Sequence, residues 1–185
     1  MPQSIFNNGE ERMEKALVAL KKDLSLVRTG RANPGVLNAV MVSYYGVPSP
    51  LSQIPAISVP EAQLLVIKPY DRSSLKDIEK AIQLADLNLV PMNDGTVIRI
   101  NFPALTEQRR KELVKDIKNM AEGTKVAIRN IRRDMVEQMK KLEKDSVISE
   151  DELKRHNDQI QKITDRFVEQ TDVIAKEKEA LVMEI

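Results

Sequence analysis

The chain has 185 residues, of which 42% are hydrophobic, 31% are charged and only 3% are aromatic. Abundant charge with few aromatic residues favours long, solvent-exposed helices over a β-sandwich. There is no cysteine and only one histidine, which excludes disulfides and thiolate metal sites, and we expect no metal and no cofactor. The formal net charge of +1 excludes bulk electrostatic attraction as the whole basis for binding a polyanion.

The sequence carries no signal for a membrane or for secretion. No apolar run approaches the ~18–20 residues that a membrane-spanning helix needs. The N-terminal sequence MPQSIFNNGEERMEK lacks a basic region followed by an apolar core, so we expect no secretory signal. Together with the absence of cysteine, these features predict a cytoplasmic protein without a membrane partner.

Prolines divide the chain into three parts, because eight of the nine lie between Pro34 and Pro103. The part before them, residues 3–29, carries an apolar stripe at alternating spacings of four and three residues. Its members are Met13, Leu17, Leu20, Leu24 and Val27. The stripe predicts a helix that packs as in a coiled coil, with Gly30 as its C-terminal cap and Pro34 preventing continuation.

The part after Pro103 predicts two long helices. In the first, residues 107–144, apolar residues recur every seven positions. These are Val114, Ala121, Ile128, Met135 and Leu142, with Ile117, Thr124 and Ile131 as a second row. The second helix begins at Ser149, which forms a capping box with Glu152, and residues 144–148 make the turn between the two helices. Its stripe is Leu153, Ile160, Phe167, Ile174 and Leu181, and His156 on this stripe is expected to have a packing role.

The three helices predict the fold class: none can bury its stripe alone, so we expect an elongated antiparallel three-helix bundle of residues 1–30 and 105–185. Residues 31–104 are then a small α/β domain inserted between two neighbouring helices, which makes the fold α+β. Two adjacent crossings at a domain boundary make a natural hinge. The expected hinge residues are Thr29, Gly30, Arg31, Pro103, Ala104 and Leu105.

Within the insert, three segments rich in aliphatic and β-branched residues predict strands, at residues 36–42, 64–67 and 96–102. The sequence Asn93-Asp94-Gly95 predicts a turn before the last of them. Between the strands, Ser73-Ser74 is expected to cap a short helix. That helix has Leu75, Ile78 and Ile82 on its apolar face.

Cations gather on one side of the helix predicted at residues 107–144. The cluster is Lys118, Lys125, Arg129, Arg132, Arg133 and Lys140. It lies beside the apolar stripe, where a partner could approach, although Glu122 intrudes. Arginine suits phosphate better than lysine does, and Arg28 and Arg31 at the first hinge crossing add two more arginines. The alternative is an ordinary solvated charged face.

Catalytic motifs are missing, because the sequence contains no glycine-rich phosphate loop, no G-x-S-x-G elbow and no recognisable nucleophile–base pair. We therefore expect a binding protein rather than an enzyme. If the partner is a nucleic acid, the scarcity of aromatic residues in the bundle argues for backbone and shape recognition rather than base stacking. Two alternatives stay open: a helical adaptor for another protein, without RNA, and a nucleotide-binding enzyme built on the small domain.

Several segments resemble the ribosome recycling factor family. They are RTGRANP (28–34), YYGVPSPLSQI (44–54), DIEKAI (77–82), NDGTVIRINFPALTEQRRKEL (93–113), VAIRNIRRD (126–134) and KEKE (176–179). They occur in order and extend through almost the whole chain. One departure is DLNLVP at 86–91, where Asn88 and Val90 replace residues of the usual D-L-G-L-N-P.

The resemblance implies an L-shaped protein with a three-helix bundle and a smaller β/α/β domain. It implies a monomer that binds the 70S ribosome after termination, with its bundle against large-subunit rRNA, and no small-molecule substrate. Elongation factor G and GTP would then drive splitting into subunits. The positions expected to bind rRNA are Arg28, Arg31, Lys118, Lys125, Arg129, Arg132 and Arg133.

Overall fold

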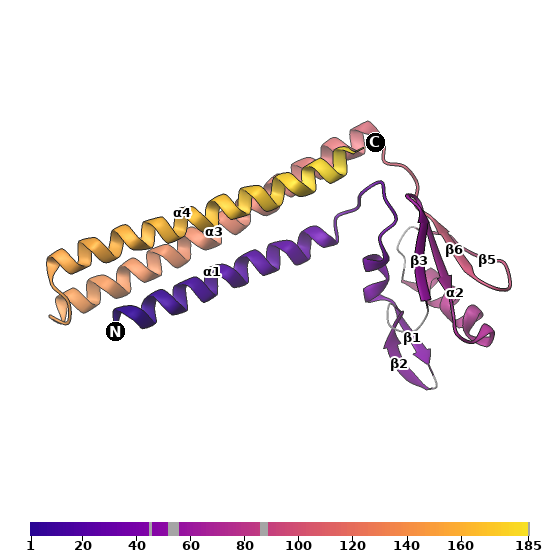
Figure 1. Ribbon diagram of the computed structural model, residues 1–185, viewed down its shortest axis with the longest axis horizontal. Helices are drawn as coiled ribbons and strands as arrows, with labels where there is room; N and C mark the ends of the chain where they lie inside the picture. The colour runs from indigo at the N-terminus through magenta and orange to yellow at the C-terminus, as the bar shows by residue number, and fades with distance from the viewer. Residues whose placement is uncertain (45, 52–55, 86–88, 185) are drawn as a thin grey trace. The chain divides into compact units, whose positions relative to one another are not determined.

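The computed structural model describes residues 1–44, 46–51, 56–85 and 89–184. The chain forms two compact units (Figure 1). One contains Met1–Val27 and Lys111–Met183, and the other contains Arg28–Arg110 with the last two residues of the chain. No helix among the described residues is both long and apolar enough to cross a membrane.

The first unit is a three-helix bundle, as predicted. Helices α1 (Pro2–Ser25), α3 (Glu107–Lys144) and α4 (Glu150–Met183) lie side by side, and a short turn joins α3 to the antiparallel α4 (Figure 1). In α1 the predicted stripe residues Met13, Leu17, Leu20 and Leu24 are buried. The helix ends at Ser25, four residues before the predicted end, so Gly30 is not its cap and Val27 is only half-buried.

The predicted seven-residue repeats of α3 and α4 are correct near the middle of the bundle and wrong toward its ends. Val114 and Leu142 are half-buried, and Leu181 is 47% exposed while its neighbour Val182 is fully buried. The positions with no exposed surface at all are instead eleven residues apart. On α3 these are Ile117, Ile128 and Met139, and on α4 they are Ile160, Thr171 and Val182. Eleven residues span about three turns of a straight helix, whereas a seven-residue repeat drifts by about 20° per heptad.

The connection between α3 and α4 is determined locally. Ser146 has a positive φ of 58°, the N–H of Ser146 donates to the carbonyl of Glu143, and the N–H of Val147 donates to that of Leu142. This pattern is a Schellman motif, which ends a helix by satisfying its last carbonyl groups. The predicted capping box at the start of α4 is confirmed: the Glu152 N–H donates to the Ser149 hydroxyl at 3.1 Å, and the Ser149 N–H donates to the Glu152 carboxylate at 2.8 Å.

The second unit combines two antiparallel sheets with one α-helix. A two-stranded sheet pairs β1 (Met41–Tyr44) with β2 (Val47–Pro50). A four-stranded sheet has the order β3-β4-β6-β5, made by Ala56–Glu61, Leu64–Lys68, Ile98–Asn101 and Pro91–Asn93 respectively. Helix α2 (Leu75–Leu84) contacts β1 of one sheet and β5 of the other, which confirms the β/α/β arrangement.

Most of the local predictions for this unit are confirmed. Leu75, Ile78 and Ile82 are the buried face of α2, although the side chain that caps the preceding turn is Asp71 rather than a serine. Gly95 adopts a positive φ of 89° in the predicted turn. The predicted strand at residues 36–42 is wrong in its first half, because Pro34–Ala39 forms a 3-10 helix. The Asn33 side chain accepts a hydrogen bond from the Gly35 N–H and so starts this helix. Asn88 lies outside the described residues.

Candidate nucleic-acid interface

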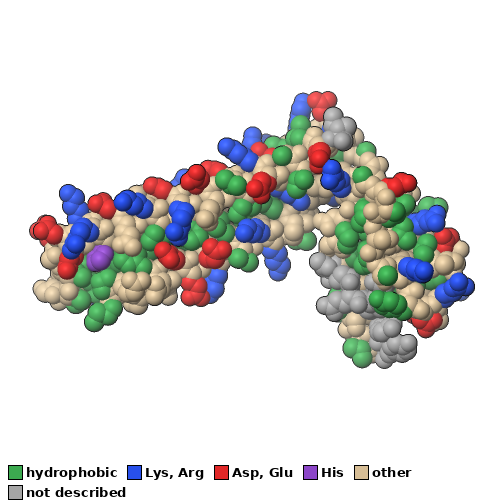
Figure 2. Space-filling model, in the orientation of Figure 1, with side chains coloured by type: hydrophobic (Ala, Val, Ile, Leu, Met, Phe, Trp, Pro, Cys, Tyr) green, Lys and Arg blue, Asp and Glu red, His purple; other side chains and the backbone are tan. Residues whose placement is uncertain are grey.

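The cations of α3 divide into two groups according to their exposure. Lys118, Arg129, Arg133 and Lys140 are exposed, whereas Lys125 and Arg132 are partly buried. The spacing of the four exposed residues places them on the same side of α3. On the face of the bundle that Figure 2 shows, Lys and Arg side chains are interspersed with Asp and Glu, so this face is not uniformly basic.

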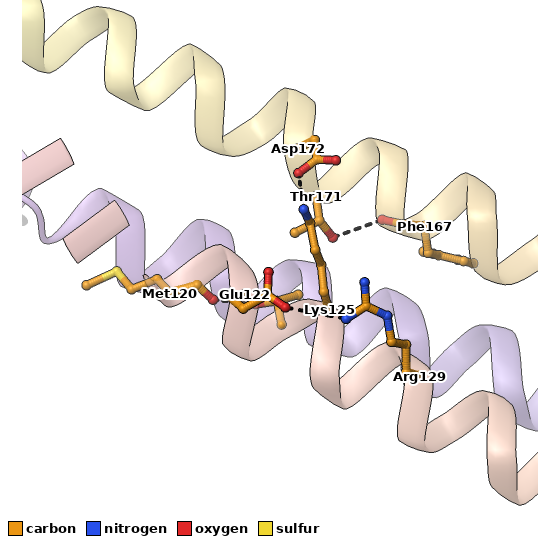
Figure 3. A network of polar contacts seen from close by, with 8 residues as sticks. Met120, Glu122, Lys125, Arg129, Phe167, Thr171 and Asp172 are labelled. Carbon is orange, nitrogen blue, oxygen red and sulfur yellow. Dashed lines mark hydrogen bonds and ion pairs between the residues drawn. The ribbon is translucent and has the colours of Figure 1, made fainter. Parts of the chain in front are cut away.

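Lys125 is directed toward α4 rather than into solvent. Its Nζ forms an ion pair with the Asp172 carboxylate, and its side chain is only 18% exposed (Figure 3). Next to Asp172 on α4, Thr171 is fully buried and its hydroxyl donates to the Phe167 carbonyl at 2.9 Å. A lysine held in this way links two helices, so it is less free to meet a phosphate than an exposed lysine.

Arg132 is also connected to α4. One of its guanidinium nitrogens donates to Oε1 of Gln161 at 3.2 Å, and the Gln161 amide donates to Asp165 at 2.8 Å. Only part of the Arg132 guanidinium is used by this bond, because the group has five N–H donors. Gln161 therefore orients the arginine while leaving donors for a further acceptor.

The other two arginines of the cluster are more accessible. Arg129 pairs with Glu122 at 3.4 Å on the same helix, and both side chains are largely exposed (Figure 3). An ion pair of this exposure contributes little, about 0–1 kcal/mol, so Glu122 competes only weakly with a phosphate. The Arg133 side chain makes no hydrogen bond or ion pair with any residue that the structure describes.

Arg28 and Arg31 belong to the second compact unit. Arg31 is exposed and pairs with Glu184 at 2.9 Å. Arg28 is half-buried, and one of its terminal nitrogens is buried without a hydrogen-bond partner among the described residues. Arg28 therefore retains unused hydrogen-bonding capacity, whereas the charge of Arg31 is neutralised by the Glu184 carboxylate in this structure.

The six expected hinge residues all lie in segments without helix or strand, between α1 and the 3-10 helix and between β6 and α3. Gly30 does not adopt a positive φ, and a β-carbon built on it meets no atom within 4 Å. The first boundary between the compact units lies between Val27 and Arg28. The second lies between Arg110 and Lys111, near the start of α3.

The histidine has a packing role. His156 is half-buried, and its ring stacks edge-on against Phe6 with the centroids 5.5 Å apart. Among the described residues, no group of three or more histidine or acidic side chains is placed to hold a metal ion.

Two residues that orient the cations, Gln161 and Asp172, were not predicted. Both lie on α4, and each meets its partner through the packing of α4 against α3. A helical wheel of α3 alone contains no information about this register.

Comparison with known proteins agrees with these features. The sequence model described as "Ribosome recycling factor" matches residues 20–183. The chain is 55% identical to the ribosome-recycling factors of Geobacillus sp. (strain WCH70) and Bacillus cereus (strain B4264), over 100% of each chain.

Two solved structures are also similar. One is a solution structure of a ribosome recycling factor, with 38% identity, a TM-score of 0.81, and coverage of 100% of this chain and 98% of that one. The other contains the T. thermophilus ribosome recycling factor and E. coli elongation factor G bound to the E. coli post-termination complex. It has 43% identity, a TM-score of 0.67 and complete coverage of both chains. This protein belongs to the ribosome recycling factor family.

Proposed function

We propose that this protein is a translation factor that disassembles the post-termination ribosome into subunits, together with elongation factor G and GTP. The observation that carries this function is the similarity over the complete chain to a recycling factor described with elongation factor G on a post-termination complex. Both compact units are included in that similarity. The helical adaptor that binds protein without RNA is therefore the less favoured function.

The exposed cations of α3 support contact with rRNA. Arg129 and Arg133 are exposed, and Arg132 keeps free donors beside its bond to Gln161. Both aromatic residues of the bundle, Phe6 and Phe167, are buried and cannot stack on bases. We therefore propose that this face binds phosphates in a defined geometry, with Lys118 as an added charge. Lys125 is expected to contribute mainly by holding α3 against α4.

The crossings at residues 29–31 and 103–105 are proposed as the hinge. Neither crossing contains helix or strand, so rotation there breaks no regular hydrogen-bonding ladder. The bundle, by contrast, has an apolar core in which Phe6, Met13, Ile128 and Phe167 from all three helices pack together. In this mechanism the bundle stays bound to rRNA while elongation factor G displaces the small domain. Arg28 and Arg31 are expected to bind rRNA next to the first crossing.

The protein is proposed to act in the cytoplasm as a monomer, by binding rather than by catalysis. GTP hydrolysis would occur on elongation factor G. Binding of ATP or GTP by this protein alone, measured by calorimetry, would argue instead for a nucleotide-dependent activity of the small domain.

The proposed function is tested by sedimentation of post-termination ribosomes with this protein, elongation factor G and GTP. We expect subunits only when all three are present. Tight binding without splitting would indicate that the elongation factor used is not a compatible partner. If the protein binds neither ribosomes nor rRNA at low salt, the helical adaptor becomes the better assignment, and its binding should vary little with salt.

A further inference from the structure

A groove on the surface of the bundle is lined by two lysines and one acidic side chain. It lies along the seam between α1 and α4 and has a volume of about 210 Å³. Its apolar walls are Leu24 from α1 and Ile174 and Leu181 from α4, and its charged side chains are Lys21, Lys178 and Glu177. These residues are separate from the cations of α3 that form the proposed rRNA contact.

We propose that Lys178 is a site of chemical acylation, with acyl phosphates as the reacting class of metabolite. Lys178 is half-buried in this groove, whereas Lys21 on the opposite helix is exposed. Neither lysine side chain forms an ion pair or hydrogen bond with a described residue. Lys178 therefore lacks the carboxylate partner that keeps an amine protonated, and the aliphatic walls on both sides of it limit its hydration.

The groove makes deprotonation of Lys178 easier than that of an exposed lysine. Burial among apolar side chains lowers the pKa of Lys178, because desolvation penalises the charged form. An unprotonated amine is the nucleophile, and a lysine desolvated in an apolar pocket is one of the standard ways in which proteins activate it.

The reaction proceeds as follows. Lys178 loses a proton to water, and its Nζ attacks the carbonyl carbon of the acyl phosphate. A carbon–nitrogen bond forms, the bond between the carbonyl carbon and the phosphate oxygen breaks, and inorganic phosphate leaves with the second proton of the amine. Lys21 lines the same groove and is assigned the part of a positioning residue, because its ammonium attracts the phosphate group. The product amide carries no charge, so its burial among Leu24, Ile174 and Leu181 is less unfavourable than that of the ammonium.

Site-resolved mass spectrometry of the full-length protein treated with acetyl phosphate tests this proposal. We expect the initial acetylation rate of Lys178 to exceed several-fold that of Lys162, an exposed lysine on the same helix, and to level off at a lower pH. A rate at or below that of Lys162 would overturn the proposal.

Two variants separate activation by burial from simple access. Leu181→Ser opens the groove at an exposed position, so the fold should survive, which circular dichroism can verify. If burial activates the amine, the Lys178 rate falls toward that of Lys162. If the rate rises instead, the wall shields the lysine and the proposal is wrong. Lys21→Ser should slow acetylation of Lys178 by acetyl phosphate more than acetylation by an uncharged acylating reagent, and equal slowing would remove Lys21 from the mechanism.

Discussion

Gly9 of α1 lies directly against the side chain of Met135 on α3. A β-carbon built on Gly9 would come within 2.8 Å of the Met135 Cγ and nearer still to its sulfur, although Met135 is only 1% exposed and has little room to move. The absence of a side chain at residue 9 therefore lets a large side chain from α3 fill the space beside α1. This contact belongs to the core formed by Phe6, Met13 and Ile128 among others.

We expect Gly9→Ala to destabilise the bundle by about 1–3 kcal/mol, because the added methyl group forces Met135 out of its packed position. The matched control is Gly123→Ala on α3, where a β-carbon would meet no atom within 4 Å. That variant should gain about 0.5–1 kcal/mol from helix propensity. Urea denaturation followed by circular dichroism measures both. Equal effects of the two substitutions would show that Met135 repacks freely. A double-mutant cycle of Gly9→Ala with Met135→Ala measures the interaction free energy between residues 9 and 135.

A second prediction concerns the Schellman motif between α3 and α4. Ser146 has a φ of 58°, a conformation that is costly for residues with a β-carbon. Ser146→Gly should raise the free energy of unfolding by about 0.5–1 kcal/mol, after allowance for the greater freedom of glycine in the unfolded chain. Ser146→Val should lower it. A stabilising effect of valine, measured as a higher urea midpoint, would contradict this account.

Arg132→Ala should weaken ribosome binding by about 1–3 kcal/mol while leaving the fold intact. Arg133→Ala should also weaken it and should lower the dependence of log Kd on log salt by about 0.7–0.9 per lost phosphate contact. Lys141→Ala is the control, because this exposed lysine lies on α3 away from the cation cluster. Binding measured by filtration at several salt concentrations distinguishes the three. Unchanged affinity of both arginine variants would exclude this face as the rRNA contact.

A hinge at residue 30 predicts that a substitution there can slow ribosome splitting without weakening ribosome binding. Gly30→Pro should leave ribosome binding largely intact but slow the release of subunits, because proline fixes φ and also restricts Thr29. Gly30→Ala is the control, since its β-carbon meets no atom within 4 Å. Light scattering of ribosomes mixed with each variant, elongation factor G and GTP follows the splitting. Normal splitting by the proline variant would argue against motion at this crossing.

Acid should destabilise the turn between β5 and β6. Hydrogen bonds donated by the N–H groups of Val97 and Thr96 hold the pKa of Asp94 below its ordinary value of 3.8, and Arg99 adds a smaller effect. The stabilisation from Asp94 is therefore fully present above pH 3.8 and is lost as the pH falls through the lower, folded-state pKa. Asp94→Asn should reduce this acid-dependent loss, because the amide oxygen still accepts both bonds but does not titrate.

Nuclear magnetic resonance of the Asp94 carboxyl carbon measures this titration directly. A midpoint at or above 3.8 would contradict the prediction. The Asp71 carboxylate, whose pKa is lowered in the same way by the N–H of Ser73, should still titrate in the Asp94→Asn variant and serves as an internal reference.

The sequence by itself determined the elements whose cause is local. The capping box of Ser149 and Glu152, the turn at Gly95 and the apolar face of α2 each depend on residues within a few positions of one another, and all three are confirmed. Hydrophobic spacing also predicted three helices that cannot bury their stripes alone. The 3-10 helix at Pro34–Ala39 was missed because the aliphatic residues of this segment were interpreted as a strand and the capping side chain of Asn33 was not considered.

Only the tertiary structure decided which residues lie at the seams of the bundle. The fully buried positions of α3 and α4 are eleven residues apart, and each becomes buried only when the other helices of the bundle cover it. Lys125 and Arg132 look equivalent to Arg129 and Arg133 on a helical wheel, yet Asp172 and Gln161 engage the first two. Their partners come from α4, and the register between two helices is determined by the whole interface rather than by either sequence stripe. The exposure of a charged group, and hence its freedom to bind phosphate, follows from that packing.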